Sequence, residues 1–233
     1  YTMSSGDVAT IEAIAHIQSP FSSKFGVPRQ SGLVEALRAK VVFCPKYRNR
    51  DAVRGLEGFD RIWLIWRFHQ AVQAEWSPTV RPPRLGGNQR IGVFATRSPF
   101  RPNSLGLSSV KLEGIEDHPE WGPVLHVAGA DLMDGTPIFD IKPYVPYADS
   151  HPDSAGGFAD QVERRMLRVV FPPELLEQIP AEHRAALKGV LAQDPRPSYQ
   201  DDPQRVYGMA FAGWNVRFRV AGEILTVLSV ETI

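Results

Sequence analysis

The 233-residue sequence contains a single cysteine, Cys44, and this scarcity excludes several classes of protein. One cysteine cannot build a disulfide framework within the chain, and it cannot supply a cysteine-rich zinc or iron–sulfur site. The six histidines show neither an HxH nor an HExxH spacing, so the sequence predicts no metal centre. A reducing cytoplasm is the compartment that fits this composition.

Long apolar runs are absent as well. No stretch approaches the ~20 residues that cross a bilayer, and the first residues lack the basic-then-apolar order of a signal peptide. We therefore expect a soluble, cytoplasmic protein. Apolar residues make up 43% of the chain, which is enough for the core of one large domain or of a main domain with a smaller appendix.

Acidic residues are missing from one long interval, although the formal net charge of the chain is zero. No Asp or Glu lies between Glu75 and Glu113. The interval carries six cationic residues, namely Arg81, Arg84, Arg90, Arg97, Arg101 and Lys111. It is interpreted either as a local basic surface for the phosphates of a nucleic acid or as a solvated edge of arginines.

Short strand-like segments dominate the first two thirds of the chain. They cover residues 9–17, 40–44, 61–68, 90–95, 105–112, 124–132 and 138–144. Because no helix of comparable length separates them, they predict a mainly β fold, a small antiparallel β-barrel or sandwich. One short helix is expected at residues 32–39, after the candidate cap Ser31.

A polar string at residues 147–157 reads as a linker and predicts a domain boundary near residue 150. Residues 1–150 would then form the barrel domain, and residues 158–233 a smaller α+β domain. In the second domain the pattern predicts a helix at 180–193. It also predicts a terminal hairpin whose strands alternate apolar and polar residues and turn at Gly222 and Glu223.

Four segments carry more polar chemistry than packing requires, namely residues 25–32, 68–70, 90–112 and 131–146. In the third of them Pro99 and Pro102 fix the backbone, and Arg97 and Arg101 add permanent charges with fork-shaped donors. A rigid arginine loop of this kind suits an anionic or carboxylate-bearing ligand.

Common nucleotide and nucleophile motifs are missing. The sequence contains no GxGxxG, no GxxxxGK[ST] and no GxSxG, so a nucleotide-like cofactor would have to be bound without a Rossmann fold. Two polar features can be interpreted either structurally or functionally. His69 is either a packing residue or a functional one, and Asp134 with Gly135 forms either a simple turn or part of a site.

Taken together, four motifs resemble the TrmO family of tRNA methyltransferases: FGVPRQ (25–30), RIWLIWRFHQ (61–70), RIGVFATRSPFRPNSLGLSSVKL (90–112) and DLMDGTPIFDIKPYVPYADS (131–150). The resemblance continues through QDPRPSYQ (193–200) and VYGMAFAGWNVRFRV (206–220), and so spans nearly the whole chain. It implies a homodimeric, S-adenosylmethionine-dependent enzyme on a small β-barrel. The implied reaction is methylation of N6 of a threonylcarbamoyl-modified adenosine beside the anticodon of tRNA.

The resemblance also implies site residues. Cofactor contacts would fall on Pro28, Arg29, Gln30, His69, Gln70, Arg97, Leu107, Asp134, Gly135, Thr136 and Pro137. Asp134 and His69 are the candidates for the group that takes the N6 proton.

For the RNA, the chemistry of the modified base suggests a carboxylate and hydroxyl clamp made of Arg101, Asn103 and Ser104. Contacts with anticodon-arm phosphates would come from Arg196, Arg217 and Arg219, whose alternative is a solvated strand face. Two other functions stay open on the residues alone: a non-catalytic barrel that binds a small nucleotide-like ligand, and a structural RNA-binding module.

Overall fold

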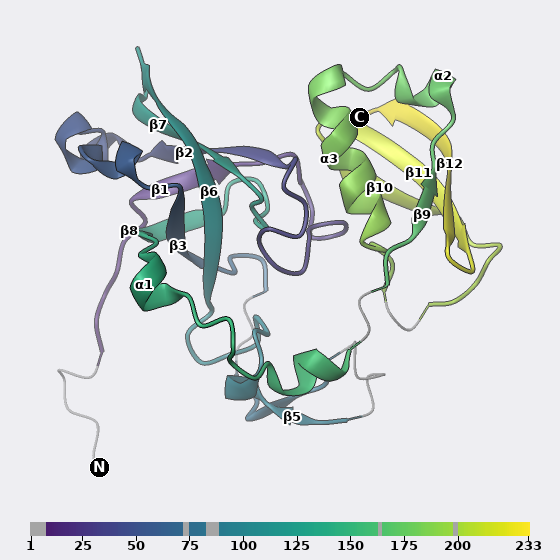
Figure 1. Ribbon diagram of the computed structural model, residues 1–233, viewed down its shortest axis with the longest axis horizontal. Helices are drawn as coiled ribbons and strands as arrows, with labels where there is room; N and C mark the ends of the chain where they lie inside the picture. Colours follow the sequence, from purple (N-terminus) through teal and green to yellow (C-terminus); the bar gives the residue numbers. More distant parts are fainter. Residues whose placement is uncertain (1–7, 72–74, 83–88, 163–164, 198–199) are drawn as a thin grey trace.

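The computed structural model describes residues 8–71, 75–82, 89–162, 165–197 and 200–233. Its first part is a closed barrel of six antiparallel strands in the order β1-β2-β7-β6-β3-β8 (Figure 1). The strands are β1 (Ala15–Gln18), β2 (Arg38–Phe43), β3 (Arg61–Arg67), β6 (Leu105–His118), β7 (Gly122–Ala128) and β8 (Pro137–Pro143). Side chains alternate between the barrel core and the outside, as in β3, where Ile62, Leu64 and Trp66 are buried.

The prediction of a mainly β fold with a small antiparallel barrel is confirmed. Two expected strands are shorter than expected. Of residues 9–17, only those from Ala15 on form a strand, β1. At 90–95 only β5 (Ile91–Gly92) is extended, paired with β4 (Thr79–Val80) outside the barrel. The next residues form a 3₁₀ turn, Val93–Ala95. Val93 is buried, and its N–H donates to the carbonyl of Pro78 at 2.9 Å, which turns the chain instead of extending it.

The C-terminal part is a four-stranded sheet in the order β10-β11-β12-β9, covered on one face by a helix (Figure 1). Its elements are β9 (Arg168–Val170), α2 (Pro173–Leu176), α3 (Ala181–Ala192), β10 (Tyr207–Phe211), β11 (Trp214–Ala221) and β12 (Ile224–Thr232). The expected helix and the expected terminal hairpin are both present. Between the two parts, α1 (Pro146–Asp149) opens the polar string expected to be a linker.

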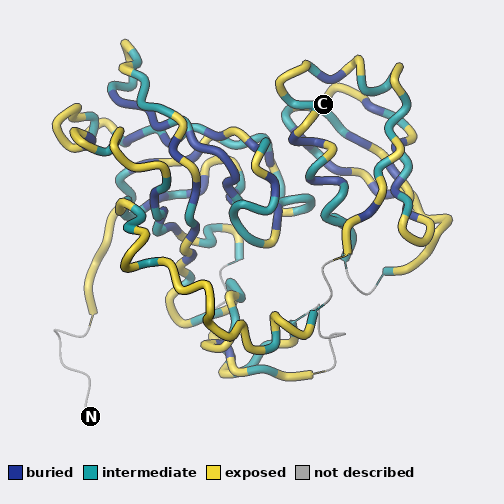
Figure 2. Tube along the Cα trace, viewed as in Figure 1, coloured by how far each residue is buried: buried dark blue, intermediate teal, exposed yellow. Residues whose placement is uncertain are grey.

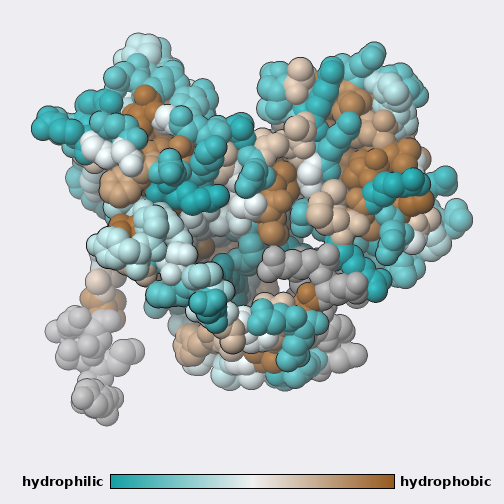
Figure 3. Space-filling model, viewed as in Figure 1, coloured by the Kyte–Doolittle hydropathy of each residue, from teal (hydrophilic) through white to brown (hydrophobic). Residues whose placement is uncertain are grey.

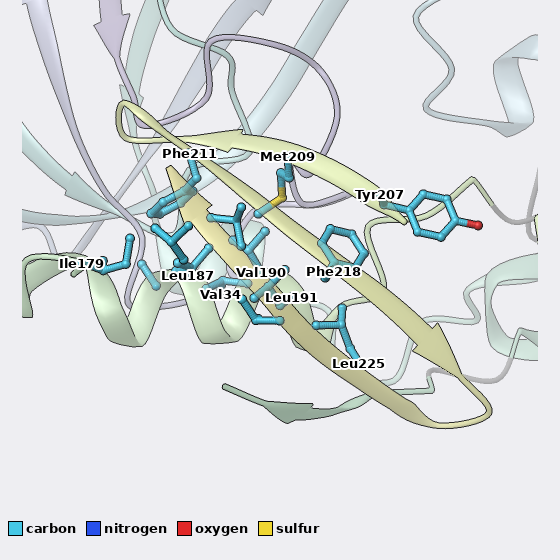
Figure 4. Packing of buried hydrophobic residues seen from close by; sticks show 14 of the residues in the cluster. Val34, Ile179, Leu187, Val190, Leu191, Tyr207, Met209, Phe211, Phe218 and Leu225 are labelled. Atoms are coloured by element: carbon cyan, nitrogen blue, oxygen red, sulfur yellow. The ribbon is translucent and has the colours of Figure 1, made fainter. Parts of the chain in front are cut away.

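Two separate sets of buried residues fill the barrel and the C-terminal part (Figure 2). The second set includes Phe21, Val34 and Leu37 from the first part of the chain. Figure 4 shows Val34 beside residues of α3 and of the C-terminal sheet. The contact is close, since a Cβ added to Gly189 of α3 would lie 2.6 Å from Cγ1 of Val34. Residues 19–37 therefore join the barrel to the C-terminal sheet.

This junction explains why the helix expected at 32–39 is wrong. The structure shows turns there and no helix, and β2 already begins at Arg38, where it pairs with Ala128. Val34 and Leu37 are buried against the C-terminal part instead of lining one side of a helix. The segment left before β2 is too short to bury these side chains and also complete stable helical turns.

Candidate functional site

Two of the polar segments meet through their side chains at one end of the barrel. The Arg97 guanidinium donates from Nη1 to Oε1 of Gln30, although the two residues lie 67 positions apart in the sequence. Pro28 is buried and fixes the backbone just before Gln30, while the Arg29 side chain is exposed. The structure therefore brings Gln30 and Arg97 together, as a common site requires.

Asp131 lies beneath this pair and connects it to the barrel wall. Nε1 of Trp66 donates to Oγ of Ser108 at 2.9 Å, and that hydroxyl donates to Oδ1 of Asp131 at 2.6 Å. Burial raises the pKa of Asp131 above its ordinary value, opposed by the Ser108 hydrogen bond, by the charge of Arg97 and by the backbone of Ser31. This carboxyl group thus links β3, β6 and both polar loops.

The turn after Asp131 holds four of the expected cofactor residues. Asp134 accepts the backbone N–H of Ser19 at 2.9 Å through Oδ1, and its own N–H donates to the carbonyl of Phe21 at 2.8 Å. Gly135 has a φ of +73°, a conformation that other residues adopt with strain. Thr136 is buried and Pro137 opens β8. The exposed side of Asp134 and Gly135 faces a hollow lined by His16, Val42, Cys44 and Arg48.

The expected residues at 69, 70, 103, 104 and 107 gather where β3 ends and β6 begins. The N–H of Phe68 donates to the carbonyl of Ser104 at 2.9 Å, so a backbone hydrogen bond to the arginine loop lies directly before His69 and Gln70. Leu107 of β6 points outward and is 54% exposed, which is unusual for a leucine in a barrel strand. It offers an apolar surface beside polar loops.

Arg101 lies within the arginine loop and braces it. Its Nη1 donates to the carbonyl of Thr96 at 2.9 Å, and the side chain is half-buried, whereas Arg97 and Asn103 are exposed. Only one guanidinium nitrogen makes that bond, so Arg101 keeps further donors for a ligand. The two arginines therefore have different surroundings, although they lie only four positions apart.

The three arginines expected to contact phosphates are also placed differently from one another. Arg217 and Arg219 are exposed on β11, on the side of the sheet opposite the buried Val216 and Phe218. Arg196 has a side chain only 10% exposed and forms hydrogen bonds of 2.8 Å from Nε and from Nη2 to the carboxylate of Asp194. Arg217 and Arg219 present their charges on an exposed face of the sheet, and Arg196 holds its own loop through Asp194. Ser198 and Tyr199 of the same motif, and Arg84 of the basic interval, lie outside the described residues.

Comparison with known proteins decides the family. A model of the tRNA-methyltransferase O N-terminal domain matches residues 16–150, and a model of the TrmO C-terminal domain matches residues 164–233. The chain belongs to the TrmO family. Its resemblance to that family through sequence motifs is thereby confirmed.

Relatives within the TrmO family cover nearly the whole chain. A tRNA (adenine(37)-N6)-methyltransferase of Escherichia coli is 42% identical, over 94% of this chain and 97% of its own length. A protein of the same name from Eikenella corrodens is 53% identical, over 75% of this chain and 98% of its own. The crystal structure of TrmO from Pseudomonas aeruginosa superposes with a TM-score of 0.79 at 33% identity, covering 96% of this chain and 98% of the other.

Asp131 is the site residue that sequence reasoning missed. Its neighbours Ala130 and Leu132 are buried, so a charged residue stands alone in an apolar stretch directly before the turn. A lone acid between two core residues is a signal that could have pointed to it, because carboxyl groups are rarely buried without a partner.

Among the helices of the described ranges, none combines the length and apolar character that crossing a membrane requires.

The raised pKa of Asp131 has a measurable consequence for stability. The folded protein binds the proton of Asp131 more tightly than the unfolded chain does. The stability that this proton contributes is therefore complete below the pKa of Asp131 in the unfolded chain, and it is lost as the pH rises through the pKa of Asp131 in the folded protein. Asp131→Asn can still accept the Ser108 hydrogen bond but cannot ionise. We expect the melting temperature of the wild type to fall relative to that of Asp131→Asn as the pH rises above the ordinary aspartate pKa of 3.8 in thermal unfolding. A relative rise would contradict the assigned direction.

Proposed function

We propose that this protein transfers a methyl group from S-adenosylmethionine to N6 of N6-threonylcarbamoyladenosine next to the anticodon of tRNA. The observation that carries the proposal is the junction of Gln30, Arg97 and Asp131 at one end of the barrel, beside the turn that begins at Asp134. The names of the relatives support the methyl-transfer reaction and the adenine N6 position. One Pseudomonas aeruginosa relative, 42% identical, is named as S-adenosylmethionine-dependent.

The side chains at this end of the barrel fit the proposed cofactor. Its amino-acid part carries a carboxylate, for which Arg97 and Gln30 are donors, and its ribose carries hydroxyls, for which Asp134 is an acceptor. Leu107 adds an exposed apolar surface for the flat adenine ring. The cofactor supplies an electrophilic methyl group on a positively charged sulfur. Its proposed contacts are Pro28, Arg29, Gln30, His69, Gln70, Arg97, Leu107, Asp134, Gly135, Thr136 and Pro137.

The protein's own work in such a reaction is alignment, exclusion of water and proton removal. The N6 lone pair is delocalised into the purine and the adjoining carbonyl, so N6 is a poor nucleophile until its proton leaves, and a nearby acceptor helps. Asp134 already accepts a hydrogen bond from Ser19, which favours an anchoring role. His69, half-buried at the end of β3, is then the proposed proton acceptor.

The modified base would be recognised by Arg101, Asn103 and Ser104, and the anticodon arm by Arg217 and Arg219 of the C-terminal domain (residues 158–233). Both parts of this assignment follow from charge: the threonylcarbamoyl group bears a carboxylate, and the backbone bears phosphates. On the face drawn in Figure 3 the surface is mostly hydrophilic, with hydrophobic side chains gathered over the C-terminal sheet. The proposal includes a homodimer acting in the cytoplasm, where its tRNA substrate would be found.

Mass spectrometry of nucleosides tests the function directly. The protein is incubated with S-adenosylmethionine and with tRNA that carries the threonylcarbamoyl group, and the digest is compared with a reaction lacking cofactor. We expect the modified nucleoside to gain the mass of one methyl group only when cofactor is present. Cofactor binding without any mass gain would indicate a non-catalytic binder, and tRNA binding indifferent to cofactor would indicate a structural RNA-binding module.

A further inference from the structure

Two large aromatic side chains stack on each other at the surface beside the candidate site. The rings of Trp76 and Phe94 have centroids 6.3 Å apart and planes inclined by only 27°. Trp76 is 51% exposed and Phe94 is 73% exposed. An exposed pair of this size leaves much apolar area in water, and such patches mark surfaces that bind something.

The pair is held in place by the small lobe formed by β4 and β5. Thr79 of β4 pairs with Gly92 of β5. Ser77, the residue directly after Trp76, donates its hydroxyl hydrogen to the carbonyl of Thr79 at 2.8 Å. Phe94 stands in the 3₁₀ turn whose first residue, Val93, is buried. Both rings are therefore carried by ordered backbone, although neither is buried in the core.

Charge around the pair favours a nucleic acid. Arg90 precedes Phe94 on the same lobe and donates from Nη1 to the Thr79 hydroxyl at 3.2 Å, and its side chain is exposed. Three residues after Phe94 comes Arg97, which contacts Gln30 of the candidate site. Glu75, next to Trp76, is the last acid before Glu113. An aromatic stack flanked by arginines is a typical arrangement for holding unpaired bases and their phosphates.

We propose that Trp76 and Phe94 form a stacking platform for an unpaired base of the RNA loop that neighbours the methylated adenosine. The inference rests on the proposed function, because it is that reaction which requires the adenosine to leave its stack. When N6 of that base is presented to a methyl donor, an adjacent base loses its stacking partner. The Trp76–Phe94 pair replaces that partner and keeps the loop open beside Arg97.

Substitutions that separate stacking from plain apolar contact test the platform. We expect Trp76→Leu and Phe94→Leu each to weaken binding of an anticodon stem-loop roughly 5- to 100-fold in fluorescence anisotropy, the range for one lost base–aromatic stack. Trp76→Phe should bind within about threefold of wild type, because it keeps a ring. Tyr147→Ala is the matched control, since Tyr147 is an exposed aromatic residue on α1. Affinity for S-adenosylmethionine should not change in any of the four.

A double-mutant cycle identifies the base. Stem-loops with an abasic nucleotide on the 5′ side or on the 3′ side of the target adenosine are bound to wild type and to Trp76→Leu. At the nucleotide that stacks on Trp76 and Phe94, the losses of binding free energy caused by the abasic site and by Trp76→Leu should not add, because both remove the same stacking contact. At the other position they should add. Full additivity at both positions overturns the proposal.

Light scattering separates an RNA platform from a contact between two copies of this chain. One outcome is that Trp76→Leu changes the oligomeric state and yet binds RNA as tightly as wild type when the two proteins are compared in the same oligomeric state. In that case the pair belongs to a subunit interface and the inference is wrong. RNA binding is measured without cofactor, so its outcome is independent of catalysis. Wild type that binds the stem-loop through Trp76 but never methylates it would refute the proposed function and leave the platform standing.

Discussion

Arg97→Ala should lower the affinity of the protein for S-adenosylmethionine by roughly 10- to 100-fold. Arg97 is the only residue in the described ranges whose side chain reaches Gln30 and whose charge also acts on Asp131. Removing it deletes a hydrogen-bond donor to a carboxylate, worth about 1.5–3 kcal/mol, and 1.4 kcal/mol corresponds to about tenfold in binding. Isothermal titration of cofactor into wild type and variant measures the difference.

The size of the effect has to be distinguished from general damage to the fold. Arg54→Ala is the matched control, because Arg54 is an exposed arginine whose ion pair with Asp51 lies in a separate surface turn. It should leave cofactor affinity and melting temperature unchanged. If Arg97→Ala binds cofactor as tightly as Arg54→Ala does, Arg97 does not belong to the cofactor site and the assignment of the two arginines is wrong.

The barrel could be predicted because its strands obey a local rule. β2 and β3 alternate buried and more exposed residues in the structure, and their β-branched and aromatic residues mark them as strands in the sequence without any knowledge of partners. Residues 32–39 could not be predicted in the same way. Their apolar spacing suits a helix, but Val34 and Leu37 pack against a sheet that begins more than 130 residues further along the chain. The pattern of apolar residues predicts that a side chain is buried, but it does not show in which of the two cores the side chain packs.

The candidate site was predictable as a set of loops and not as a network. Polar residues at strand ends, such as Gln30 and His69, stand out because packing does not explain them. Asp131 stands out only as a lone acid between two buried residues, and the sequence does not show its partners, the Ser108 hydroxyl and the Arg97 charge, which lie on other elements. The surroundings of Arg196 were hidden in the same way, because a sequence does not reveal that its Nε and Nη2 donate to the carboxylate of Asp194.

Arg101→Ala should remove the preference for the threonylcarbamoyl group while sparing cofactor binding. The catalytic efficiency, kcat/KM, with a modified stem-loop should fall roughly 100-fold, because a carboxylate left without its charged partner in a desolvated site costs about 2–5 kcal/mol. With an unmodified stem-loop, kcat/KM should change much less, since that substrate lacks the carboxylate.

The Arg101 guanidinium also braces its loop through Thr96, so a structural effect has to be separated from recognition. Arg101→Lys keeps the charge and loses the fork of donors, and it should recover part of the preference, because a point charge satisfies a carboxylate less well than a bidentate pair. A loosened loop would instead move Arg97 and weaken cofactor binding in both variants. An unchanged ratio between modified and unmodified substrates in Arg101→Ala would exclude Arg101 from recognition and transfer that role to another group on the loop, with Asn103 as the next residue to substitute.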